Sequence, residues 1–189
     1  MQGSIQDDAW PEAVRRFWFI ELDESDWFRP ADQDALDATI KARFEGQYEA
    51  LRARASTLDP PDGPVALAMI LVLDQFPRNM FRDTPAMFAT DDDALRLAQI
   101  SVARGYDTAL TPEERQFLFM PYMHSEDAGV QAAAIDLFRS IGKADVDMFA
   151  LRHKEIIDRF GRFPHRNAIL GRETTDEEAA FLKEPNSSF

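Results

Sequence analysis

Two short segments of the chain carry nearly the same set of side chains about ninety residues apart. We call Phe76–Asn79 the FPRN segment and Phe163–Asn167 the FPHRN segment, after their sequences. Proline interrupts helices, phenylalanine anchors a turn in a core, and arginine, histidine and asparagine supply hydrogen-bond donors. An arginine from each segment can hold a phosphate or a carboxylate through paired hydrogen bonds. The two segments therefore predict helix ends that face one anion-binding pocket.

The polar residues in and around these segments form the candidate site. We expect Asp74, Arg78, His165 and Arg166 to lie close together in space, because the two segments share their chemistry. Histidine and carboxylate side chains are common general acids and bases. The candidates for acid–base catalysis are His124, His165 and Asp74. The candidates for ligand binding are Arg78, Asn79, Arg162, Arg166, Asn167 and His153.

Several of these residues also have a purely structural interpretation. Asp74 closes an apolar helix, where a carboxylate is costly unless a cation such as Arg78 pairs with it, so an internal ion pair is the main alternative. His153 falls on an apolar helical stripe and is predicted to face the interior, as hydrogen-bonded core histidines do. His124 precedes a predicted helix N-terminus, which attracts anions.

Sequence motifs for known chemistry are missing from the chain. There is no His-Glu-x-x-His sequence, no glycine-rich phosphate loop and no Gly-x-Ser-x-Gly elbow. We therefore predict no metal, name no cofactor, and leave open whether the protein is an enzyme.

Composition indicates one globular domain over residues 1–189, with 45% hydrophobic residues and no cysteine. The net charge of −13 argues against nucleic-acid binding, which depends on neutralising phosphates. Residues 152–172 are the exception, with six Lys or Arg and two acids, a local charge of +4. The longest apolar run, Val65–Leu73, is nine residues and too short for a membrane span of about 20. We expect a cytoplasmic protein without a membrane partner.

Helical periodicity dominates the chain and predicts an all-α fold of about eight helices, stacked as antiparallel hairpins or packed as a compact bundle. Trp27 and Phe28 are predicted to anchor a loop, and Thr90 and Ser125 to cap helices. Capping boxes are predicted over residues 111–114 and 175–178, and Gly161 is predicted to end a helix. Proline is expected to end helices at Phe76-Pro77 and before Pro121. The predicted helices cover approximately residues 11–19, 32–58, 65–75, 91–104, 112–119, 126–141, 144–160 and 176–183.

Five motifs occur in order and together resemble the bacterial domain-of-unknown-function 924 family. They lie at residues 17–19, 27–28, 71–79, 121–127 and 159–172, and the resemblance extends from about Phe17 to Leu182. It implies an all-helical fold similar to tetratricopeptide-repeat superhelices. It supplies no activity, cofactor or catalytic residue.

Two functions from different classes fit these observations. One is binding of a small anion, with or without catalysis, at the FPRN and FPHRN segments. The other is a helical module that binds a peptide or protein partner, in which both segments are purely structural.

Overall fold

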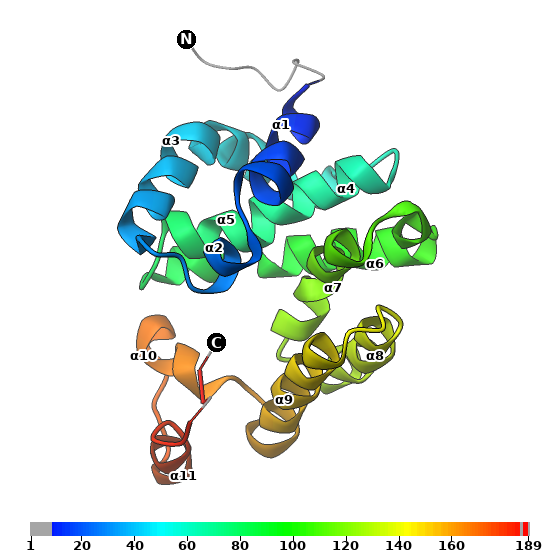
Figure 1. Cartoon of the computed structure of the whole chain (residues 1–189). Coiled ribbons are helices and arrows are strands. Elements are labelled where there is room, and N and C mark those ends of the chain that lie inside the picture. The colour runs from blue at the N-terminus through cyan, green and yellow to red at the C-terminus, as the bar shows by residue number, and fades with distance from the viewer. Residues whose placement is uncertain (1–8, 186, 189) are drawn as a thin grey trace. The chain divides into compact units, whose positions relative to one another are not determined.

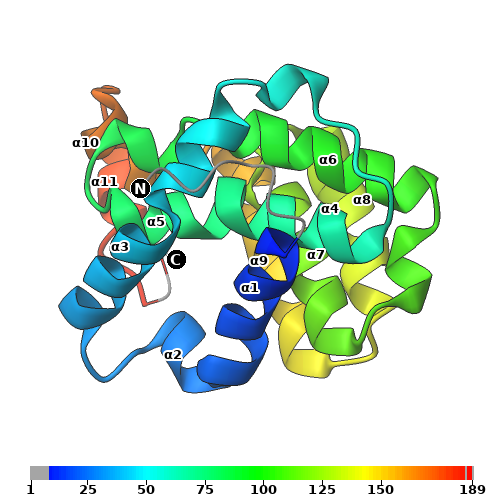
Figure 2. The ribbon, with the colours of Figure 1, turned by 90° about the horizontal axis from the view of Figure 1, so that it is seen from above.

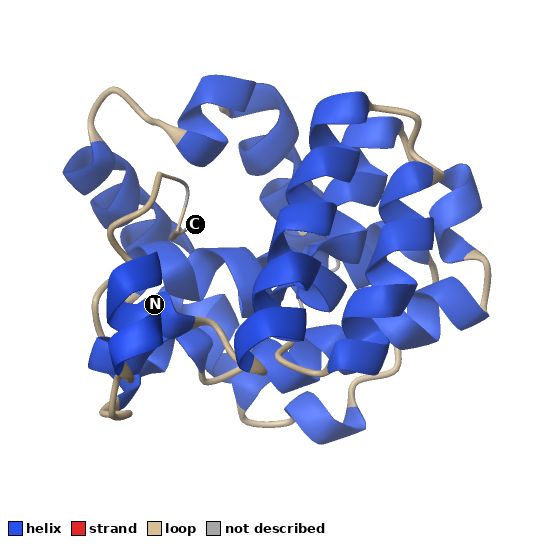
Figure 3. Cartoon of the chain, turned by 90° about the horizontal axis from the view of Figure 1, so that it is seen from below, coloured by secondary structure: helices blue, strands red, loops and turns tan. Residues whose placement is uncertain are grey.

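All regular structure in the computed structural model is helical. The structure describes residues 9–185, 187 and 188, and no strand occurs in that part of the chain (Figure 1; Figure 3). The predicted all-α fold is therefore confirmed. None of the described helices has the length and apolar character needed to cross a membrane.

The chain divides into two compact units, which we describe separately. Unit 1 comprises residues 1–82 and 86–121, and unit 2 comprises residues 83–85 and 122–189. Unit 1 contains α1 (Trp10–Arg16), α2 (Glu24–Phe28), α3 (Gln33–Arg52), α4 (Gly63–Ile70), α5 (Phe76–Met80), α6 (Asp91–Ala103) and most of α7 (Pro112–His124). Unit 2 contains the end of α7, α8 (Ala128–Arg139), α9 (Ala144–Phe160), α10 (Asn167–Leu170) and α11 (Asp176–Phe181). The predictions of a single domain and of a tetratricopeptide-like superhelix stay predictions.

The centre of unit 1 is one continuous helical segment from Gly63 to Met80. It consists of α4, a π-helical turn over Leu71–Gln75, and α5. The apolar side chains of residues 66–73 are buried all round, as the sequence predicts. Helices α1 and α6 pack against α4, and α3 packs against α5 (Figure 2).

Pro77 does not end this helix, so the prediction of a break at Phe76-Pro77 is wrong. The wider π-turn places the Phe76 N–H on the Leu71 carbonyl. Pro77 has no N–H to offer the Leu73 carbonyl four residues earlier, and the Thr90 hydroxyl donates to that oxygen instead, at 2.5 Å. Thr90 is the residue before α6, but its hydroxyl does not cap the helix as predicted, because it serves Leu73.

Pro121 is also inside a helix, and α7 continues to His124 instead of ending near Phe119. The predicted capping box at its start is confirmed, since Thr111 and Glu114 exchange hydrogen bonds of 3.0 and 3.2 Å. Apolar side chains on both sides of Pro121 are buried, and their burial outweighs the loss of one helical hydrogen bond.

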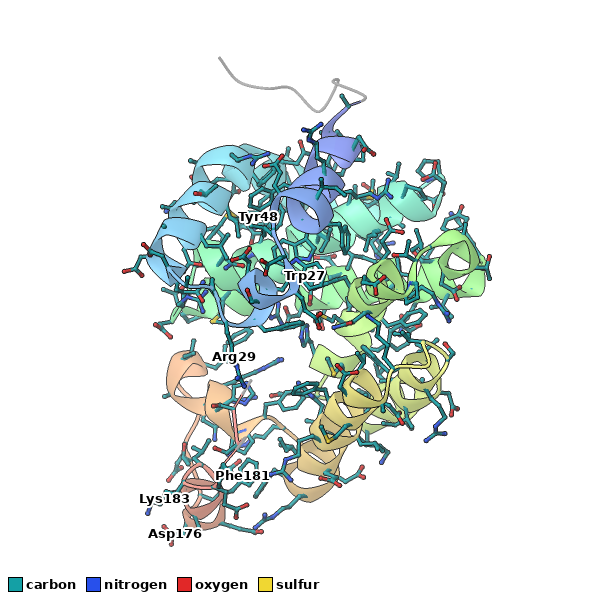
Figure 4. The ribbon with its side chains drawn as sticks, viewed as in Figure 1. Trp27, Arg29, Tyr48, Asp176, Phe181 and Lys183 are labelled. Carbon is teal, nitrogen blue, oxygen red and sulfur yellow. The ribbon has the colours of Figure 1, made fainter. Side chains whose placement is uncertain are left out.

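Trp27 and Phe28 lie in a short helix, α2, and not in a loop. A capping box between Asp23 and Asp26 begins this helix. The indole N–H of Trp27 donates to the Trp18 carbonyl at 2.7 Å, and the Trp27 ring packs against Phe117 at 4.9 Å between centroids. Aromatic packing therefore orders a segment too short to be recognised by periodicity (Figure 4, Trp27).

In unit 2, α8 packs against α9 as a helical hairpin. Asp127, and not Ser125 as predicted, caps α8 by accepting from the Val130 N–H at 2.9 Å. Helix α9 has the predicted bounds and ends at Gly161, whose φ of 69° suits glycine. Its last turns form a core with α11. That core consists of Ile156, Ile157, Phe160, Phe163 and Phe181 (Figure 4, Phe181).

Candidate functional site

Two histidines and one arginine contact the ring of Phe163 in unit 2, and a third histidine lies beside one of them. We call His124, His153, His165 and Arg166 the histidine–arginine cluster. The ring centroids of His153 and His165 each lie 5.6 Å from that of Phe163, and the rings of His124 and His153 are 6.5 Å apart. The Arg166 guanidinium lies over the Phe163 ring at 4.7 Å. Phe163 thus anchors the FPHRN segment and sets the positions of its donors.

An ion pair between Glu126 and Arg172 holds the FPHRN segment in place. Two hydrogen bonds of 2.7 and 3.0 Å join the Arg172 guanidinium to the Glu126 carboxylate. The same carboxylate accepts from the Phe163 N–H at 2.8 Å, and Arg172 donates to the Phe163 carbonyl at 3.0 Å. Burial raises the pKa of Glu126, but these donors outweigh it and hold the pKa below its usual range.

Side chains also fix the backbone on which His124 sits. Gln131, fully buried on α8, donates to the carbonyls of Met123 and Ser125, at 2.7 Å each. Arg166 donates to the His124 carbonyl at 2.9 Å. Carbonyls at the end of a helix lack partners within the helix, and a cation there is favoured by the helix dipole.

Burial and positive neighbours keep two of the histidines neutral. Burial lowers the pKa of His153 to about 3, against a weaker opposing effect of the Phe149 carbonyl and with added repulsion from His124, His165 and Arg166. Burial, followed by repulsion from Arg166, lowers the pKa of His165 to about 4. At neutral pH both rings are uncharged imidazoles beside a permanent cation.

The tautomer of His153 follows from its hydrogen bond. Its Nδ1 lies 2.8 Å from the Phe149 carbonyl oxygen, which only accepts, so Nδ1 carries the proton. The Nε2 atom of the neutral ring is then an acceptor. The prediction that His153 faces the interior is confirmed, since it is 5% exposed.

The FPRN segment lies in unit 1, and its arginine, Arg78, forms ion pairs with two aspartates. Two hydrogen bonds of 2.9 Å join Arg78 to Asp91 on α6, and a guanidinium nitrogen lies 3.4 Å from the Asp74 carboxylate. The predicted pairing of Arg78 with Asp74 is therefore confirmed. Asn79 donates to Asp37 on α3 at 2.8 Å. These contacts tie α5 to α3 and α6.

Two further ligand-binding candidates contact Glu178 on α11. Arg162 holds its carboxylate with hydrogen bonds of 2.6 and 2.8 Å, and Asn167 donates to it at 3.3 Å. Glu178 also completes the predicted capping box with Thr175. The Arg162 hydrogen bonds, opposed by burial and helped by Thr175, lower the pKa of Glu178 to about 2.

The structure thus groups the candidates by unit. The histidine–arginine cluster, Arg162 and Asn167 lie in unit 2, whereas Asp74, Arg78 and Asn79 lie in unit 1. The predicted meeting of Asp74 and Arg78 with His165 and Arg166 stays a prediction, since each unit is described by itself. Among the residues that the structure describes, no group of three or more acidic or histidine side chains is arranged to hold a metal ion.

Sequence reasoning missed the supporting roles of Glu126, Arg172 and Gln131. Glu126 has a sufficient local explanation as an acid near a helix start, and Arg172 is separated from it by 46 residues. The sequence signal that pointed toward Arg172 is the local charge of residues 152–172, in which Arg172 is one of the six cations.

Comparisons with known proteins give a family and a fold. The model of a family described as bacterial proteins of unknown function (DUF924) matches residues 14–186. A solved structure of a protein of unknown function from Agrobacterium tumefaciens is similar, with a TM-score of 0.83 and 36% sequence identity. The similarity covers 93% of this chain and 97% of that one. None of the curated proteins is significantly similar to the chain.

Proposed function

We propose that this chain, which belongs to the DUF924 family of bacterial proteins, binds a small anion, a phosphate or a carboxylate, at the histidine–arginine cluster. The observation that carries the proposal is the packing of His153, His165 and Arg166 around the Phe163 ring, with His124 beside His153. A guanidinium group binds a carboxylate or phosphate through paired hydrogen bonds, and the N–H of a neutral imidazole can donate one more.

The electrostatics of the cluster support an anion. Glu126 is the acid whose charge raises the pKa of His165, and it also acts on Arg166, but Arg172 already donates to both of its oxygens. Positive neighbours contribute to the low pKa of His153 and His165 by disfavouring the protonated rings, and a bound anion would oppose that effect. Binding would thereby raise the pKa of either ring.

Acid–base chemistry is a further part of this proposal. His124 and His165 are half-buried, so each can exchange protons with a bound ligand more readily than buried His153. His165 is neutral at pH 7 and would act first as a base. Asp74, Arg78 and Asn79 contribute to the same ligand only if the FPRN segment also reaches it.

A ligand screen with matched variants tests the proposal. Thermal stability is measured with inorganic phosphate, phosphomonoesters, and mono- and dicarboxylates, and each stabilising anion is then followed by calorimetry. We expect one class of anion to stabilise the wild type, and Arg166→Gln and His165→Asn to weaken its binding at least tenfold. Arg159→Ala is the matched control. Arg159 is one of the six cations of residues 152–172, and its ion pair with Glu177 is exposed.

Variants are compared only after circular dichroism shows that they retain their helix content. Arg78→Ala then reports on the FPRN segment, since loss of binding in that variant supports the predicted meeting of the two segments. The proposal fails if no anion of either class stabilises the protein, or if Arg166→Gln binds as tightly as Arg159→Ala. In that case the alternative of a helical module for a peptide or protein partner is favoured.

A further inference from the structure

The solvent-exposed side of α9 carries three large apolar side chains, Met148, Phe149 and Leu151, of which Met148 and Phe149 are the most exposed. Met148 is 60% exposed and Phe149 is 51% exposed, although most large apolar residues of the chain are buried. Asp145 precedes them by one turn on the exposed surface, and Arg152 follows by one turn with 35% of its side chain exposed. These four positions are spaced i, i+3, i+4 and i+7, which places them on a single stripe of a helix.

The order of the acidic, apolar and basic side chains along this stripe makes the stripe self-complementary. When two copies of α9 run antiparallel across a two-fold axis between Met148 and Phe149, each Met148 faces the Phe149 of the other copy. Each Asp145 then faces the Arg152 of the other copy, so that two opposite-charge pairs flank an apolar centre. A parallel alignment in register would instead place Asp145 against Asp145 and Arg152 against Arg152, which is unfavourable.

The present partner of Arg152 does not prevent such an exchange. A guanidinium nitrogen of Arg152 lies 3.3 Å from the carboxylate of Glu155, whose side chain is 66% exposed, and the guanidinium also lies 5.9 Å from the centre of the Phe181 ring. Exposed ion pairs of this kind contribute only about 0–1 kcal/mol, so a pair with Asp145 of a second copy can replace it.

We propose that α9 is a self-association surface, at which a second copy of this chain docks antiparallel through Asp145, Met148, Phe149 and Arg152. The contact spans only about two helical turns, and small interfaces of this kind give weak complexes. The dimer is therefore expected to form reversibly as protein concentration rises. The proposal does not depend on anion binding, because buried His153 is not part of the stripe.

Sedimentation velocity on the full chain, from about 5 to 500 µM, tests this surface. We expect the wild type to pass from monomer toward dimer over this range, and more so at low salt, because the charge pairs are screened less. Asp145→Arg and Arg152→Asp should each shift the midpoint at least tenfold upward. The double reversal, Asp145→Arg with Arg152→Asp, should restore it, because the charges again face their opposites.

The matched control is Asp158→Arg, which makes the same charge reversal at an exposed position of α9 outside the stripe. It should leave the midpoint unchanged. A monomer at the highest concentration overturns the proposal, as does a dimer that Asp145→Arg does not weaken. Failure of the double reversal to recover association, with both single variants folded by circular dichroism, rejects the antiparallel pairing.

Discussion

The neutral state of His153 predicts that one substitution removes part of the sensitivity of the protein to acid. Its pKa falls from the ordinary 6.5 to about 3 in the folded chain, chiefly through burial. Below pH 6.5 the unfolded chain takes up a proton at this ring and the folded chain does not. Acid therefore favours unfolding, and this loss of stability grows as the pH falls from 6.5 toward 3.

The size of the effect follows from the same two values. At pH 5 the His153 ring is still neutral in the folded chain. In the unfolded chain it is protonated, because pH 5 is 1.5 units below its ordinary pKa of 6.5. Each tenfold change in proton concentration is worth about 1.4 kcal/mol, so His153 costs about 2 kcal/mol of stability at pH 5 relative to pH 8. His153→Asn keeps a donor for the Phe149 carbonyl but does not titrate.

Urea unfolding followed by circular dichroism at 222 nm measures this difference. Stability is determined at pH 8 and pH 5 for the wild type and for His153→Asn, in buffers free of phosphate and carboxylates that would occupy the cluster. We expect the variant to lose about 2 kcal/mol less than the wild type on going to pH 5. An equal loss in both proteins would refute a neutral, buried His153. His153→Gln serves as a second variant if the asparagine does not fold.

Two further predictions concern the fold. Thr90→Val should destabilise the protein by about 1–2 kcal/mol in urea unfolding because it leaves the Leu73 carbonyl without its donor, whereas Thr90→Ser should not. In a Pro77→Ala background, which supplies a helical N–H, Thr90→Val should cost less, and an unchanged cost would contradict this account. As for the single domain, all three tryptophans lie in unit 1, so their fluorescence and the 222 nm signal of the whole chain should show coincident urea transitions. Separate midpoints would mean two domains.

Local signals in the sequence were sufficient for many helix ends but not for the two prolines. Gly161 and the capping box at Thr175 depend on residues within one turn, and both predictions are confirmed. The path of the chain through Pro77 depends on Thr90, which donates to Leu73 from seventeen positions away. A donor supplied from a distant segment leaves no trace in local periodicity, so proline was read as a helix end.

The same distinction separates the parts of the site that could be predicted from those that could not. His153 was placed in the interior by its position on an apolar helical stripe, which is a local pattern. The pair of Glu126 and Arg172 joins residues from the start of α8 and the segment after α10, so neither residue predicts the other. The sequence indicates which residues could bind or catalyse, whereas the partner of each residue depends on the tertiary fold.

The partners also distinguish the two arginines that the sequence made look equivalent. Arg78 is held by the carboxylates of Asp91 and Asp74, so its positive charge is balanced inside unit 1. Arg166 donates to the carbonyl of His124, lies over an aromatic ring and acts on the Glu126 carboxylate, which also accepts hydrogen bonds from Arg172 and the Phe163 N–H. An anion brought to Arg78 would compete with the carboxylates of Asp91 and Asp74, whereas at Arg166 it would compete with Glu126, which Arg172 already holds with two hydrogen bonds. The two similar segments therefore differ in their acidic neighbours, and this difference is why we propose the anion site at the FPHRN segment.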